Sequence, residues 1–96
     1  MSFEYNVVTD KKIDFAFLQK LCDYLKKNRS FEDIKVKENG LFISDKTSNW
    51  ELVGINLISI GLFVSVNLSA IQRNELLLLI QNFMQDQGLG VVIDEI

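Results

Sequence analysis

The spacing of apolar residues switches between a strand period and a helix period along this chain, and the order of the switches limits the possible folds. Phe3, Tyr5 and Val7 alternate with polar residues, as in a half-buried strand. Apolar residues then fall at helical spacing from Ile13 to Leu25, and they do so again from Ile71 to Met84. The stretches around these two helices have the character of strands.

Capping residues predict where the two helices begin and end. Asp10 or Asp14 is suited to cap the first helix, which we expect to end near Asn28. Ser69 stands three residues before a glutamine, which is a capping-box pattern at the start of the second helix. Gly88 supplies the left-handed residue that ends this helix.

Turn residues predict two hairpins between the helices. Asn39-Gly40 lies between two apolar runs and is typical of a type I′ turn, which needs positive φ at both central residues. After a polar loop over Asp45–Asn49, strands at Trp50–Ile58 and Leu62–Leu68 form the second hairpin. Leu89–Ile96 is rich in residues that favour strands and is expected to dock as the last one.

The resulting order is β-α-β-β-β-β-α-β, which predicts a single α+β domain over residues 1–96. We expect a mixed or antiparallel sheet with both helices packed on one face. The strand-like run from Leu52 to Val66 is interrupted by polar residues and glycines and is shorter than the roughly 20 residues of a membrane helix, so no membrane association is expected.

Groups that commonly carry catalysis are missing from this sequence. It contains no histidine, and its only cysteine, Cys22, falls on the apolar face of the first helix, where an inert core thiol is expected. Its serines and glycines match no nucleophile elbow, P-loop or dinucleotide fingerprint. We therefore expect a protein that is not an enzyme, with no catalytic residues and no cofactor.

The sequence offers no recognisable metal site. The close acidic pairs are Glu32-Asp33 and Asp94-Glu95, and adjacent residues on a strand point to opposite faces, so neither pair is expected to share an ion. Residues distant in sequence, such as Glu51 and Asp94, remain an alternative as a carboxylate pair that the fold brings together.

Charge is distributed unevenly along the chain. Nine of the ten basic residues precede position 49, and the net charge is −3. This balance opposes nucleic-acid binding. A small basic patch is conceivable in the first half, but acidic residues are interspersed with its members, so we expect a mixed solvated surface there; the basic residues are Lys26, Lys27, Arg29, Lys35 and Lys37.

The acidic second half instead suggests a protein partner, attracted by charge and held by an aromatic anchor. Trp50 is the candidate anchor, and a core tryptophan at the start of a strand is the competing interpretation. Leu77, Leu78 and Met84 widen the apolar surface of the second helix, which suits either a dimer contact or complete burial. The candidate partner-binding residues are Asp45, Trp50, Glu51, Asp86, Asp94 and Glu95.

In size, acidity and lack of catalytic groups, the chain resembles the immunity proteins of bacterial toxin systems, including contact-dependent growth inhibition. The resemblance implies a protein that neutralises a cognate toxin domain, such as a basic nuclease, by covering its active site. One alternative is a secretion chaperone or dimeric adaptor that uses the second helix and a strand edge. Another is a small enzyme that uses carboxylate, lysine or tyrosine groups such as Glu51 and Tyr5.

The single cysteine bears on the cellular compartment of this protein, whereas the sequence leaves its oligomeric state open. A single cysteine cannot form an intramolecular disulfide, and no signal-peptide pattern precedes the first strand, so a cytoplasmic location is expected. A chain of this size buries only about 60–65% of its unfolded surface. Either a monomer or a homodimer is compatible with that limit.

Overall fold

The computed structural model describes residues 3–28, 33–44 and 50–96. Within these residues the element order is β-α-β-β-β-β-α-β, which confirms the predicted α+β fold. The loop predicted over Asp45–Asn49 lies outside the described residues. The elements are β1 (Phe3–Thr9), α1 (Phe15–Lys27), β2 (Ile34–Lys37), β3 (Gly40–Ser44), β4 (Glu51–Ile58), β5 (Gly61–Val66), α2 (Ala70–Asp86) and β6 (Val91–Glu95).

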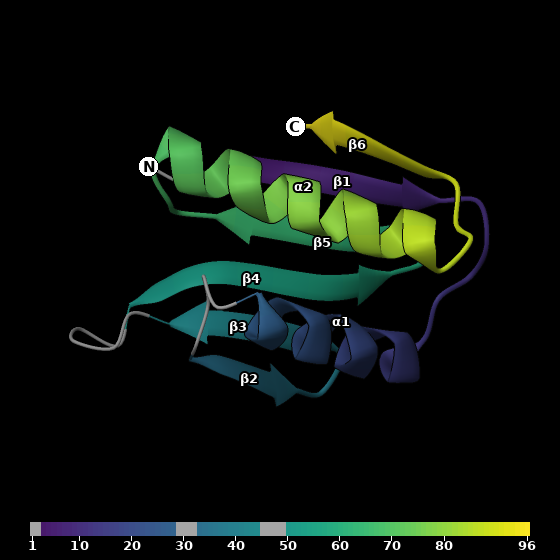
Figure 1. Ribbon diagram of the computed structural model, residues 1–96, viewed down its shortest axis with the longest axis horizontal. Helices are drawn as coiled ribbons and strands as arrows, with labels where there is room; N and C mark the ends of the chain where they lie inside the picture. The colour runs from purple at the N-terminus through teal and green to yellow at the C-terminus, as the bar shows by residue number, and fades with distance from the viewer. Residues whose placement is uncertain (1–2, 29–32, 45–49) are drawn as a thin grey trace.

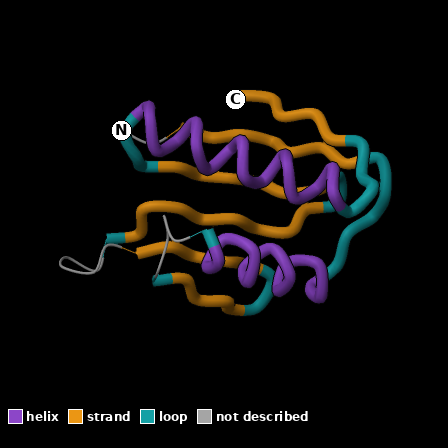
Figure 2. Tube along the Cα trace, in the orientation of Figure 1, coloured by secondary structure: helices purple, strands orange, loops and turns teal. Residues whose placement is uncertain are grey.

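The six strands form one sheet in the order β2-β3-β4-β5-β1-β6. Every neighbouring pair is antiparallel, so of the two predicted arrangements the antiparallel one is correct. Both helices cover the same face, with α2 over the half of the sheet that contains β1 and β5, and α1 over the half that contains β2 and β3 (Figure 1). The other face carries neither helix (Figure 2).

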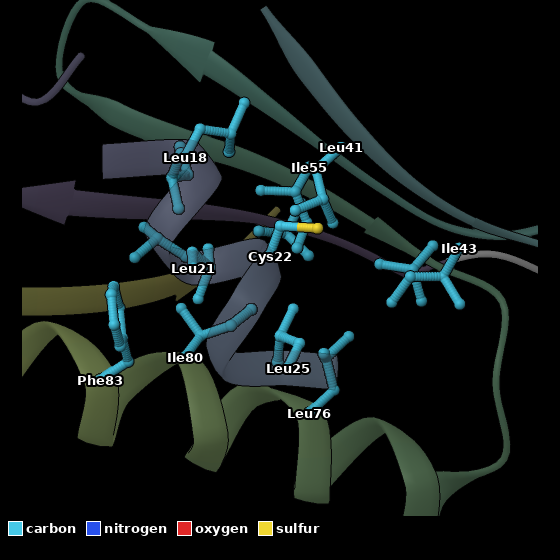
Figure 3. Close-up of a cluster of buried hydrophobic side chains, with 14 of the residues drawn as sticks. Leu18, Leu21, Cys22, Leu25, Leu41, Ile43, Ile55, Leu76, Ile80 and Phe83 are labelled. Carbon is cyan, nitrogen blue, oxygen red and sulfur yellow. The ribbon is translucent and has the colours of Figure 1, made fainter. Parts of the chain in front are cut away.

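The hydrophobic core lies between the two helices and the covered face of the sheet (Figure 3). Leu21 of α1 and Ile80 of α2 are completely buried there, together with strand residues such as Ile55. The Phe83 ring lies 5.3 Å from the Phe17 ring and 5.0 Å from the Tyr24 ring, centroid to centroid, which joins the two helices. Aromatic pairs at this distance stabilise a contact beyond the area they bury.

One residue predicted for the apolar face of α2 is not in the core. Ile71 is 80% exposed, so its assignment to the buried face is wrong. It lies in the first turn of α2, where Arg73 and not Ile71 faces the sheet, with its guanidinium carbon 3.8 Å from the centre of the Phe3 ring. Leu76 and Met84, further along the same helix, are completely buried.

The predicted caps are present, and the structure chooses between the two candidates for α1. The Asp14 carboxylate accepts a hydrogen bond from the Phe17 N–H at 3.0 Å, so Asp14 and not Asp10 caps α1. Ser69 caps α2 by accepting from the Gln72 N–H at 3.3 Å. Gly88 follows α2 with φ of 79°, as predicted for the residue that ends the helix.

The first hairpin turns one residue earlier than predicted. Lys37 pairs with Gly40, so Glu38 and Asn39 form the turn and Gly40 is the first residue of β3. Among the described residues other than glycine, only Glu38 has positive φ, so the predicted type I′ turn is wrong. Packing in the sheet, and not the turn, accounts for the glycine at position 40. A Cβ on Gly40 would come within 2.7 Å of both the Phe42 ring and the Asn56 side chain.

Candidate protein-binding face

The face of the sheet opposite the helices, called the open face below, is covered by neither of the two described helices (Figure 2). Side chains alternate across a strand, so residues between buried core positions point to this face. Asn6 lies between buried Tyr5 and Val7, and Gly54 lies between buried Val53 and Ile55. The strand registers then determine which open-face residues stand beside one another.

Two rows of open-face residues cross the sheet, and each carries a lysine at one end and a carboxylate at the other. In the first row the lysine is on β2 and the aspartate is on β6, and this row runs Lys37, Gly40, Asn56, Phe63, Asn6, Asp94. In the second row the lysine is again on β2 and the glutamate is on β1, and this row runs Lys35, Phe42, Gly54, Ser65, Glu4.

All four charged residues that end these rows are exposed. The β2 edge of the open face is therefore basic, and the edge formed by β1 and β6 is acidic. Lys35 and Lys37 belong to the basic patch considered from the sequence, but α1, which carries Lys26 and Lys27, lies on the other face of the sheet. Those four lysines therefore do not form one patch.

An aromatic ring covers two glycines in the middle of the open face. A Cβ atom added to Gly40 would lie 2.7 Å from Cζ of Phe42. A Cβ atom added to Gly54 would lie 3.6 Å from Cε1 of the same ring. The ring thus lies across the backbone of β3 and β4, an arrangement known to stabilise glycines in sheets. Phe42 and Phe63 are both half-buried and give this region its apolar surface.

A β-bulge brings Glu51 onto the open face. The register between β3 and β4 shifts, so that Ile43 pairs with Val53 while Ser44 pairs with Glu51. Leu52 is the extra residue, and it packs against the core. A Cβ on Gly54 would lie 2.7 Å from Oε1 of Glu51, so this carboxylate rests above β4 beside the Phe42 ring. Without the bulge, strict alternation would turn Glu51 toward the helices.

A third row adds an apolar strip at the end of the open face near the β4–β5 turn. Ile58, Gly61, Val8 and Val92 pair in sequence across four strands. Val92 is 58% exposed and Ile58 is 36% exposed. Singly exposed apolar side chains are common on protein surfaces, so this strip adds apolar area to the open face without by itself marking an interface.

The structure brings together only some of the predicted partner-binding residues. Glu51 and Asp94 both lie on the open face, but on β4 and β6, which are separated by two strands, so they do not form a catalytic carboxylate pair. Glu95 pairs with buried Tyr5 and therefore points to the helix side. Asp86 is the last residue of α2, at the end of the molecule opposite Glu51 (Figure 1). Asp45 lies outside the described residues.

Trp50 is not a core residue. Its side chain is 67% exposed, immediately before β4 and next to Glu51 in the chain. The interpretation of Trp50 as a buried tryptophan at the start of a strand is therefore wrong, while its role as an anchor for a partner stays a prediction.

Sequence reasoning did not assign Glu4, Phe42 or Phe63 to a site, and it considered Lys35 and Lys37 only as members of a basic patch. Lys35, Lys37 and Glu4 were visible as the polar members of alternating strands, and Phe42 and Phe63 stood at the alternate positions of apolar runs. Nothing in the sequence showed that these five residues share one surface, because their proximity depends on the order of the strands.

The groups considered for a small enzyme do not converge. Tyr5 is buried on the helix side of the sheet, whereas the Glu51 carboxylate lies on the open face. Cys22 is buried in α1, and burial raises the pKa of its thiol, with the opposing charge of Lys26 a smaller influence. A buried thiol with a raised pKa is a poor nucleophile.

A hollow of about 310 Å³ lies elsewhere, where the start of α1 meets the residues before β6. Lys11, Lys12 and Lys20 line it, and the Asp14 carboxylate in its wall is already engaged in capping α1. In the part of the chain that the structure describes, no three histidine, cysteine or carboxylate side chains gather as a metal site would require. Neither described helix is long and apolar enough to cross a membrane.

Comparison with models of protein families, with curated proteins and with solved structures returns no match for this chain. The geometry of the open face is therefore the basis for a functional proposal.

Proposed function

We propose that this protein is a non-catalytic binding module that neutralises a toxin domain, docking a basic surface of that domain on the open face. The observation that supports this proposal is the presentation of Glu4, Glu51 and Asp94 on a sheet face that neither described helix covers. These carboxylates surround half-buried aromatic rings, a combination of charge and apolar area that suits protein recognition.

Charge and aromatic groups have separate roles in such an interface. Carboxylates at the acidic edge steer a basic partner toward the face and determine its orientation, and their effect weakens as salt increases. Affinity depends more on aromatic anchors that lose contact with water in the complex. Trp50 is a candidate for this role because its side chain is exposed in the free protein and it directly precedes Glu51 in the chain.

The proposal is tested with the product of the gene adjacent to the gene for this chain, which the proposal expects to encode a toxin domain. Cells that express the toxin domain are expected to survive only when this chain is expressed with it. Isothermal titration of the two purified proteins is expected to give a complex whose affinity falls as sodium chloride is raised from 50 to 300 mM, roughly in line with the screening of exposed charges.

A matched pair of variants locates the binding surface. Asp94→Asn removes a charge from the open face, and Asp86→Asn removes the same charge at the end of α2. The first is expected to weaken toxin binding about fivefold to tenfold, in the range of a single interfacial charge, while the second leaves it unchanged. Equal effects of the two variants, or the absence of any protection by the wild-type chain, would contradict the proposal.

A secretion chaperone or dimeric adaptor is the second candidate function, and the exposed residues of α2 favour it. Ile71 and Leu78 are 80% and 56% exposed and stand seven residues apart, on one side of the helix. If α2 forms the working interface, Leu78→Glu abolishes association while the open-face variants do not. Toxin protection would then be absent as well.

A further inference from the structure

We propose that the open face binds a second copy of this chain, in a symmetric dimer whose two-fold axis runs parallel to the strands. The observation behind this proposal is the order of the charged residues along the two rows of the open face. Lys35 and Lys37 stand at one end of two adjacent rows, and Glu4 and Asp94 stand at the other. This inference does not rest on toxin neutralisation, but a dimer and a toxin complex would use the same face and therefore exclude each other.

Within one copy the charges at the two ends of a row cannot pair with each other. Lys37 and Asp94 are on the two outermost strands, five strand spacings apart, which is about 24 Å. Screening reduces the attraction between exposed charges beyond about 8 Å at physiological ionic strength. Both edges therefore remain available to opposite charges on another molecule.

A two-fold axis parallel to the strands, placed between β4 and β5, brings these charges together. It lays β2 of one copy over β6 of the second, β3 over β1, and β4 over β5. Lys37 then lies opposite Asp94 of the second copy, and Lys35 lies one strand from Glu4 of the second copy. By symmetry each contact occurs twice. An axis across the strands would instead place β2 over β2, with lysine against lysine.

The shape of the open face suits the same arrangement. The Phe42 ring covers two glycines in the middle of the face, and sheets that pack face to face lie about 10 Å apart. Ile58 falls opposite Gly61 of the second copy, where no side chain stands in its way. Aligned sheets cross at about −30°, which shifts the outer strands by about one row. Because Lys35 and Lys37 occupy adjacent rows of β2, a shift of one row in the sense that moves Lys35 toward Asp94 of the second copy keeps a lysine opposite that carboxylate.

The size of the face is adequate for a stable dimer. The molecule measures 37 by 25 Å along its two longer axes, and the sheet spreads in the plane of these axes (Figure 1). A standard interface takes about 800 Å² from each partner. The open face therefore has room for an interface of ordinary size, with the charges that end the two rows at its rim and the Glu51 carboxylate inside it, beside the Phe42 ring.

The first test is the mass of the full chain in solution, measured by sedimentation velocity and by light scattering. At about 100 μM and low salt the wild-type chain is expected to be a dimer, and raising the salt is expected to weaken it because the paired charges lie at the rim. A monomer under these conditions overturns the proposal. This result would not bear on the proposal of toxin binding, because the affinity for the toxin domain is measured in a separate experiment.

Charge reversal tests which residues face each other. Lys37→Glu and Asp94→Lys each place like charges in contact twice, so each variant alone is expected to weaken the dimer at least about tenfold. Mixing these two variants is expected to restore dimers that contain one copy of each, because every contact again joins opposite charges. Lys20→Glu on α1 makes the same change on the covered side and is expected to have no effect.

Restoration on mixing also shows that both variants are folded. A dimer that survives both single reversals overturns the proposal, and so does a mixture of the two variants that stays monomeric. If Leu78→Glu separates the wild-type dimer and the reversals do not, the dimer forms through α2 and the proposal for the open face is wrong.

Discussion

Asp10 and Gly90 exchange two hydrogen bonds across eighty residues of sequence. The Gly90 N–H donates to Oδ1 of Asp10 at 2.9 Å, and the Asp10 N–H donates to the carbonyl oxygen of Gly90 at 3.1 Å. This pair joins the end of β1 to the residue that precedes β6, so it fixes the acidic edge strand against the rest of the sheet.

Removing the Asp10 carboxylate is expected to loosen that connection. Asp10→Ala should lower the free energy of unfolding by about 1 kcal/mol, the usual contribution of such a hydrogen bond. Asp10→Asn retains an acceptor oxygen and should retain most of the stability. Urea denaturation measures the difference as a lower midpoint with an unchanged slope. Asp86→Ala serves as the control, and a loss of equal size there would show that the Asp10 effect is not specific.

Gly61 is expected to be intolerant of any side chain. Its φ is 147°, and a Cβ at this position would overlap the carbonyl oxygen of Val7 on the neighbouring strand. Gly61→Ala should therefore cost more than about 2 kcal/mol of stability, since strained backbone and a steric clash combine. Thermal unfolding followed by circular dichroism measures this loss.

Gly88 provides the matched comparison for Gly61. Its φ of 79° is also positive, but a Cβ there would have no heavy atom within 4 Å. Gly88→Ala should lower the free energy of unfolding by only about 1 kcal/mol, which is the effect of the left-handed backbone alone. Similar losses for the two variants would contradict the steric explanation offered for Gly61.

Cys22 is expected to link stability to pH in the alkaline range. Burial raises the pKa of its thiol above the ordinary value of 9.0, because the thiolate is poorly solvated in the core. The folded state then holds this proton more tightly than the unfolded state does. The resulting stability is complete below the unfolded pKa and is lost as pH rises through the folded pKa.

The measurement compares wild type with Cys22→Ala between pH 7 and pH 10.5. The alanine variant should lose less stability than wild type above about pH 9, where an unfolded thiol begins to ionise. In addition, an aromatic disulfide reagent should modify Cys22 slowly in the folded chain and rapidly in urea. Parallel pH curves for the two proteins would show that the buried thiol has no such effect.

Trp50 is expected to contribute to binding and not to folding. Because its side chain is 67% exposed, Trp50→Ala should change the free energy of unfolding by less than about 0.5 kcal/mol. As the only tryptophan of the chain, it reports alone on its surroundings by fluorescence. Acrylamide should quench it readily in the free protein and less readily in a complex with the toxin domain. Unchanged quenching in a tight complex would exclude Trp50 as an anchor.

Much of the fold was predictable because its signals are local. The change from period two to helical spacing predicted the order of elements, and Ser69 and Gly88 marked the ends of α2 through hydrogen bonds and dihedral angles that involve nearby residues. The turn at Glu38-Asn39 was predicted one residue late, because the position of Gly40 depends on the Phe42 ring and on Asn56 of the next strand.

The candidate site was much less predictable, because it depends on contacts between distant segments. The sequence alone determined that Lys35, Lys37, Glu4 and Asp94 are polar positions in strands or strand-like stretches. Only the tertiary structure decided that the lysines lie on one edge of the open face and the carboxylates on the other, since strand order and register are set by packing across the whole sheet. The bulge at Leu52 likewise decided that Glu51 belongs to that face.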